Sequence, residues 1–225
     1  MILHRVKLNY RGLQTVMPRV VSTHQNSLPG DFSGDMAAGS LLVVESRKIA
    51  RLLLEGSSKD DWYRAIVVEN ILQKRSPSSA IRQARLIRHR LQLMTPTLWE
   101  MVEKGDAETA TQALLASAIK HSRLLADFMD QVVRHHHRVF DPQLSARDWS
   151  DFLETCGHLD ANVNTWSELT RKKLRQVIFR ILAEAKYVDS TRSMKLTPVV
   201  VVDEVRRYLL ENQELFVLRC MEVTR

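Results

Sequence analysis

Apolar residues recur every three to four positions along most of the chain beyond residue 40, which is the period of an amphipathic α-helix. In the first half, this period predicts helices over residues 41–56, 59–71 and 77–94. Ser58 and the pair Ser76-Pro77 stand where helix starts are expected, because a serine hydroxyl caps a free backbone N–H and proline fits the first helical position. Five of the seven glycines fall at or before Gly56. The rest of the chain therefore favours long helices joined by short turns.

The helical period continues through the second half of the chain. It predicts helices over residues 96–105, 106–119, 122 to the three histidines at 135–137, 146–156 and 166–185. Ser145 with Asp148 resembles a capping box, in which the cap and the third helical residue exchange hydrogen bonds. Thr165 with Glu168 has the same spacing and predicts the start of the helix that ends near Ala185.

Composition divides the chain into three regions. Residues 1–40 are irregular and are expected to form a basic, loosely ordered arm; residues 41–94 form a helix-turn-helix-like basic unit; residues 95–225 form a C-terminal helical domain. The final helix is expected to begin at Thr197-Pro198, although 199–202 fits a short strand equally well. The sequence thus predicts an all-α fold of helical bundles, with at most a small β element near the C-terminus.

The positive charge is concentrated in the first part of the chain. Residues 1–100 contain 15 Lys and Arg against 8 Asp and Glu, whereas residues 101–225 contain 18 of each. The whole formal net charge of +7 therefore belongs to the first hundred residues. Between Asn70 and Trp99 the chain has six Lys and Arg and no acidic residue. Such asymmetry suggests a nucleic-acid or membrane-surface partner, and nucleic acid is the interpretation that we prefer.

The predicted helix over 77–94 separates apolar from basic residues. On a helical wheel one arc is apolar and contains Ala80, Ala84, Ile87, Leu91 and Met94. The opposite side contains Arg82, Arg85, His89 and Gln92, with Arg88 flanking them. Three consecutive helices of which the last is basic match a helix-turn-helix arrangement, whose last helix enters the major groove.

The chemistry of this helix suits DNA. Guanidinium groups bind phosphates or guanine edges in a bidentate way, and serines at a helix N-terminus suit a phosphate oxygen. The predicted DNA-binding residues are Lys74, Arg75, Ser78, Ser79, Arg82, Arg85, Arg88 and His89. The alternative is a solvated basic face, but this helix lacks acidic partners three or four positions away. Leu86 and Leu93 lie toward the polar side and could instead mark an edge for protein docking.

A second basic group lies on the predicted helix over 166–185. It consists of Arg171, Lys172, Lys173, Arg175 and Arg180. Acidic residues are close in sequence, so a solvated face is the first interpretation and a contact with the DNA backbone is the alternative.

Other chemistry-bearing residues indicate neither catalysis nor metal binding. Three adjacent histidines on a regular helix point about 100° apart and cannot all bind one ion, so no metal or cofactor is expected. The chain lacks a phosphate-binding glycine loop, a nucleophile elbow and a zinc-protease helix, so we expect no enzyme. Asp127 and Asp130 are expected to balance Arg123 and Arg134. The tryptophans are expected to be core anchors.

Cysteine usage and hydropathy point to the cytoplasm. Cys156 and Cys220 lie far apart and form no disulfide framework, which fits a reducing compartment. We find neither the apolar core of a signal peptide nor a run of about 20 apolar residues. We therefore expect a cytoplasmic protein with no membrane partner.

Several ordered segments over residues 38–188 resemble the BrxA family of the BREX (bacteriophage exclusion) defence systems. They are ESRKIARLLLEG (45–56), ENILQKRSPSSAIRQARLIRHRL (69–91), LLASAIKHSRLLADFMDQVV (114–133), DWSDFLE (148–154) and WSELTRKKLRQVIFRILAEA (166–185). The resemblance implies an all-helical fold likened to the antitermination factor NusB, and a non-enzymatic role in binding double-stranded DNA. It also implies work beside an adenine-specific methyltransferase, an ATPase and an alkaline-phosphatase-like protein.

Three functions remain open at this point. The first is a sequence-tolerant subunit that binds duplex DNA; if it neutralises about six phosphates, its affinity falls with salt at a log–log slope near −5. The second is an interaction scaffold whose basic face meets an acidic protein. The third is RNA binding, which predicts a preference for RNA and exposed aromatic residues for stacking.

Overall fold

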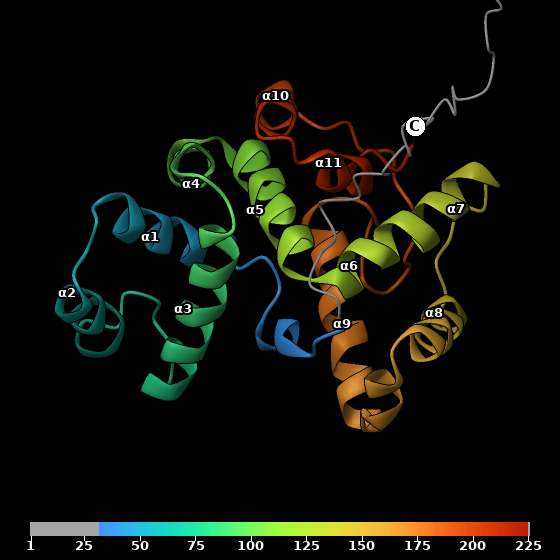
Figure 1. Cartoon of the computed structure of the whole chain (residues 1–225), viewed down its shortest axis with the longest axis horizontal. Helices are drawn as coiled ribbons and strands as arrows, with labels where there is room; N and C mark the ends of the chain where they lie inside the picture. Colours follow the sequence, from blue (N-terminus) through green and yellow to red (C-terminus); the bar gives the residue numbers. More distant parts are fainter. Residues whose placement is uncertain (1–31, 225) are drawn as a thin grey trace, which may run out of the picture.

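The computed structural model describes residues 32–224, and it confirms an all-α fold (Figure 1). The helices of its first half are α1 (Val43–Leu54), α2 (Lys59–Tyr63), α3 (Pro77–Gln92), α4 (Pro96–Lys104) and α5 (Ala107–His121). Those of its second half are α6 (Arg123–Asp127), α7 (Arg134–Arg138), α8 (Ala146–Leu159), α9 (Glu168–Glu184), α10 (Asp203–Glu211) and α11 (Leu215–Met221). Single-turn elements are the 3₁₀ helices η1 (Asp35–Ala38) and η4 (Ala161–Thr165), and the π-helices η2 (Arg64–Val68) and η3 (Phe128–Val133).

Helix α5 forms the centre of the fold. It is buried along most of its length, and α1, α3, α4, α6, α10 and α11 pack against it. Helices α1, α2 and α3 lie on one side of α5 and helices α8 and α9 on the other, with residues 32–42 passing between α3 and α9 (Figure 1). Phe128 packs edge-on against Trp149, Phe152 and Phe179, with ring centroids 5.2–5.7 Å apart, and so joins α8 and α9 to the core.

Part of the expected N-terminal arm is packed into this core. Phe32, Met36 and Leu41 are buried, and η1 packs against α9 and α3. Residues 1–31, which make up the rest of the arm, lie outside the described residues.

Most predicted helix starts are confirmed by the capping bonds. Ser58 with Asp61 and Ser145 with Asp148 form complete capping boxes. Ser76 accepts a hydrogen bond from the backbone N–H of Ser79, with Pro77 in the first helical position. Asp106 caps α5 in the same manner.

The predicted capping box of Thr165 and Glu168 is wrong. Residues 161–165 form the 3₁₀ helix η4, so Thr165 belongs to the preceding turn. Ser167 has the extended backbone of a cap, and its hydroxyl accepts the N–H of Thr170. Helix α9 therefore begins at Glu168.

The predicted helix start at Thr197 is also wrong, because α10 begins at Asp203. The buried side chain of Gln112 holds the preceding segment extended: its Nε2 donates to the Val200 carbonyl (3.0 Å), and its Oε1 accepts from the Val202 N–H (2.8 Å). Among the described residues the β element is limited to two isolated bridges, Gln143–Lys195 and Val188–Leu196. The same residues contain no helix long and apolar enough to span a bilayer.

Candidate nucleic-acid interface

Helix α3 has the two faces that the helical wheel predicts. The five apolar residues of the predicted inner face are all buried: Ala80, Ala84, Ile87, Leu91 and Met94. On the outer face Arg82, Arg85, His89 and Gln92 are exposed. The predicted docking edge is wrong in one residue, because Leu86 is only 5% exposed and packs inward, whereas Leu93 is 42% exposed.

Four of the predicted DNA-binding residues, three arginines and one histidine, are exposed. They are Arg75, Arg82, Arg85 and His89. No carboxylate within residues 32–224 forms an ion pair with any of them. Because α3 also has no acidic residue of its own, this face presents an uncompensated positive field to solvent.

Two further predicted residues are engaged within the protein. Lys74 is half-buried and forms an ion pair with Glu45 of α1. The Arg88 guanidinium lies over the Trp62 ring, 4.7 Å from the ring centroid, and is also half-buried. Such a cation–π contact stabilises the packing of α2 against α3, so Arg88 has less freedom to reach a ligand than Arg82 or Arg85.

The serines at the start of α3 form a local hydrogen-bond network. The Ser76 hydroxyl lies 3.1 Å from the hydroxyls of Ser78 and Ser79 and accepts the Ser79 N–H at 3.3 Å. Ser78 is exposed and Ser79 is half-buried. The Ser79 N–H is therefore occupied by the cap, and Ser78 is the better placed of the two predicted serines to meet a phosphate.

The connection before α3 is longer than expected. The second helix ends in the π-helix η2 at Val68, and residues 69–76 lead to α3. Asn70 closes this loop by bonding through its side chain to both the N–H and the carbonyl of Lys74, each at 2.9 Å. Helix-turn-helix motifs use a turn of about 3–4 residues. The helix-turn-helix assignment therefore stays a prediction.

Arg90 of α3 is the one arginine of this helix that is buried, with 2% of its surface exposed. Its guanidinium donates to the backbone carbonyls of Gly39 and Ser40, and burial lowers its pKa to about 10. From the opposite side, Glu184 of α9 accepts hydrogen bonds from the Ser40 hydroxyl (2.7 Å) and the Leu41 N–H (2.9 Å). Residues 39–41 are thus held between α3 and α9.

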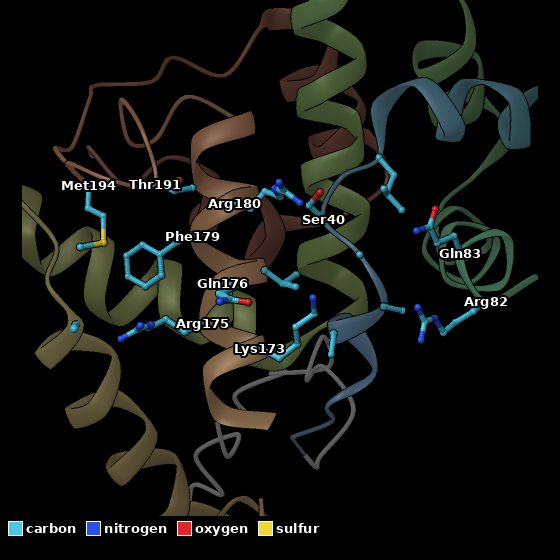
Figure 2. Close-up of a pocket in the computed structure, with 16 residues that line it drawn as sticks. Ser40, Arg82, Gln83, Lys173, Arg175, Gln176, Phe179, Arg180, Thr191 and Met194 are labelled. Atoms are coloured by element: carbon cyan, nitrogen blue, oxygen red, sulfur yellow. The ribbon is translucent and has the colours of Figure 1, made fainter. Parts of the chain in front are cut away.

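A cavity of about 860 Å³ lies over this clamped segment (Figure 2). Its α3 wall carries Arg82 and Gln83. Its α9 wall carries Lys173, Gln176 and Arg180, whereas Arg175 points to the other side of α9, away from α3 (Figure 2). Among residues 32–224, no acidic residue lines the cavity. The structure therefore brings Arg82 of the predicted site beside part of the second basic group, a proximity that sequence reasoning missed because the two helices are about ninety residues apart.

The other members of the second basic group face elsewhere. Arg171 donates to the backbone carbonyls of Trp166 and Val163, at 3.2 and 3.4 Å, and so stabilises the turn before α9. Lys172 lies on a separate hollow between α8 and α9.

Several of the histidines and acids noted in the sequence make contacts within the protein. His136 is buried between Asp141 (3.3 Å) and Asp148 (3.2 Å), and residues 32–224 contain no group of three residues that could hold a metal ion. Asp127 and Asp130 pair with Arg123 (3.3 Å) and Arg134 (3.0 Å), as predicted. Trp149 is buried, and Trp62, Trp99 and Trp166 are half-buried against the core.

The fold and this surface define an all-α protein with a basic cavity between two helices, which no carboxylate of the described part of the chain lines. The chain belongs to the BrxA family, whose model matches residues 30–213. A "BREX protein BrxA" from Paramagnetospirillum magneticum is 46% identical over 193 residues, which cover 86% of this chain and 97% of that protein. One from Escherichia coli is 33% identical and covers 78% and 83%.

A solved structure has the same fold. The crystal structure of an uncharacterized protein from Magnetospirillum magneticum has a TM-score of 0.80 and 44% sequence identity, and covers 85% of this chain and 98% of its own. The names of the relatives place the family among the components of BREX phage-defence systems.

Proposed function

We propose that this chain is a non-enzymatic subunit of a BREX system that binds double-stranded DNA, and that the outer face of α3 makes the contact. The observation that carries the proposal is the set of exposed cations Arg82 and Arg85 on α3, a helix without acidic residues, and Arg75 in the loop just before it; none of the three forms an ion pair within residues 32–224. Phosphate neutralisation supplies most of the affinity of sequence-tolerant DNA binding, and arginine suits phosphate geometry better than lysine.

The proposed contact face favours DNA over RNA. The described tryptophans pack on the core, and the exposed rings of Tyr63 (59% exposed) and Phe140 (91% exposed) lie outside α3, so the outer face of α3 has no Phe, Tyr or Trp of the kind on which single-stranded RNA bases stack. A protein scaffold remains a testable outcome. Other BREX components, namely the methyltransferase, the ATPase and the phosphatase-like protein, are the protein partners that this role implies.

The test is electrophoretic mobility shift on duplex DNA and duplex RNA of equal length across a salt series. The three exposed arginines alone correspond to a log–log slope of roughly −3, and any further phosphate contacts steepen it. Arg82→Glu/Arg85→Glu should abolish the shift, whereas Arg138→Glu/Arg207→Glu, with the same change in net charge on exposed residues of α7 and α10, should keep it.

Three results would overturn the proposal. They are no shift of DNA at low salt, a stronger shift of RNA than of DNA, and equal losses in the two double variants. No shift of DNA would indicate that the basic face binds a protein partner. A stronger shift of RNA would indicate that it binds RNA. Equal losses in the two double variants would show that binding depends on the net charge of the protein and not on α3.

A further inference from the structure

We propose that the cavity between α3 and α9 seats the phosphate backbone of one DNA strand, so that α9 is a second DNA-binding helix. This inference rests on the proposed function and adds a ligand site to it. Arg82 extends from α3 toward residues 37–42, and Lys173 and Arg180 extend from α9 toward the same segment (Figure 2).

The charge of the cavity favours an anionic ligand. Arg82, Lys173 and Arg180 are exposed, and within residues 32–224 none of them forms an ion pair. Like charges gathered around a hollow repel one another, and a phosphate strand relieves that repulsion as it enters. Glu184, the nearest acid of α9 in sequence beyond Arg180, is engaged with Ser40 and Leu41 instead.

The shape of the floor admits a sugar–phosphate strand. Four small residues, Ala37, Ala38, Gly39 and Ser40, form the floor between the charged walls. At Gly39 an added Cβ would lie 2.7 Å from Leu42 Cδ1, so a side chain at this position would have to displace the end of the Leu42 side chain. Gln83 and Gln176 add neutral hydrogen-bonding groups to the two walls, and such groups are common partners of phosphate and sugar oxygens.

The walls are held at a fixed separation. Arg90 of α3 and Glu184 of α9 bind opposite sides of residues 39–41, and these bonds lie within the protein itself. A site whose charged groups are already placed loses little conformational entropy when it binds. The cavity is therefore preorganised for a backbone that contacts both helices.

The test measures duplex binding of Lys173→Ala/Arg180→Ala by fluorescence anisotropy across a salt series. Loss of two phosphate contacts should flatten the slope by about two and weaken binding about ten-fold near 150 mM salt, equally on unrelated sequences. The matched control is Lys172→Ala/Lys186→Ala, two exposed lysines near the same helix that line other hollows. The control should stay within about two-fold of the wild type.

Each outcome separates this inference from the proposed function. If Lys173→Ala/Arg180→Ala behaves like its control while Arg82→Glu/Arg85→Glu loses binding, DNA contacts α3 alone and the inference is refuted. If both lysine-containing double variants weaken binding equally, the effect is overall charge, which also refutes it. If only Lys173→Ala/Arg180→Ala loses binding, DNA contacts α9 without α3. That result refutes both the assignment of DNA to α3 and a strand seated between the two helices.

Discussion

Acidification should destabilise this protein through His121, the last residue of α5. Its Nδ1 is buried and has no hydrogen-bond partner within residues 32–224. Burial, reinforced by the positive charge of Arg90, lowers the His121 pKa from 6.5 to about 4. Between pH 6.5 and pH 4, His121 therefore binds a proton in the unfolded chain but not in the folded chain. Stability is highest above pH 6.5 and is lost as pH falls toward 4.

The size of the loss in stability follows from the shift in the His121 pKa. The full difference corresponds to about 3 kcal/mol in the free energy of unfolding, of which a little over half, about 2 kcal/mol, falls between pH 7 and pH 5. Because His121 is only half-buried, solvent screens part of the penalty, and we expect a loss of about 1 kcal/mol over that range.

Urea unfolding at pH 7 and pH 5 measures the effect in wild type, His121→Gln and His158→Gln. His121→Gln cannot take up the proton, so its loss between the two pH values should be about 1 kcal/mol smaller than that of the wild type. His158 is exposed on α8, and its variant should follow the wild type. Equal pH dependence in wild type and His121→Gln would refute the reasoning.

Two further predictions concern local packing. Ser76→Ala removes the cap of α3 and should lower the free energy of unfolding, measured in urea, by about 1 kcal/mol. The control is Ser150→Ala, at an exposed mid-helix serine bonded back to the Ala146 carbonyl, which should change that free energy by only a few tenths of a kcal/mol. Equal effects of the two substitutions would show that the cap contributes nothing. Cys156 and Cys220 are buried, and burial raises the pKa of Cys156 to about 12, so a thiol reagent at pH 8 should label neither until the chain unfolds. Rapid labelling of the native protein would contradict their burial.

Local signals in the sequence predicted most of the fold. Helix starts at Ser58, Ser76 and Ser145 depend on hydrogen bonds between residues three positions apart. The residue types at this short spacing can be read directly from the sequence. The start of α10 could not be found in this way. The extended residues before it depend on Gln112, a side chain about ninety positions earlier.

In the candidate site, too, the sequence predicted the local features but not the contacts between distant elements. The helical period separated exposed Arg82 and Arg85 from the buried face of α3. It did not show that Arg90 binds carbonyls fifty residues earlier, or that Lys74 pairs with Glu45. These contacts join elements that are distant in the chain, so they depend on the tertiary arrangement and leave no periodic signal.

The most direct test of the central claim compares duplex-DNA affinity in two variants of equal net charge. Arg82→Glu/Arg85→Glu changes the outer face of α3, and Arg138→Glu/Arg207→Glu changes exposed residues of α7 and α10. If α3 contacts DNA, the first variant loses binding at moderate salt and the second stays close to the wild type. Equal affinities in the two variants would contradict the account.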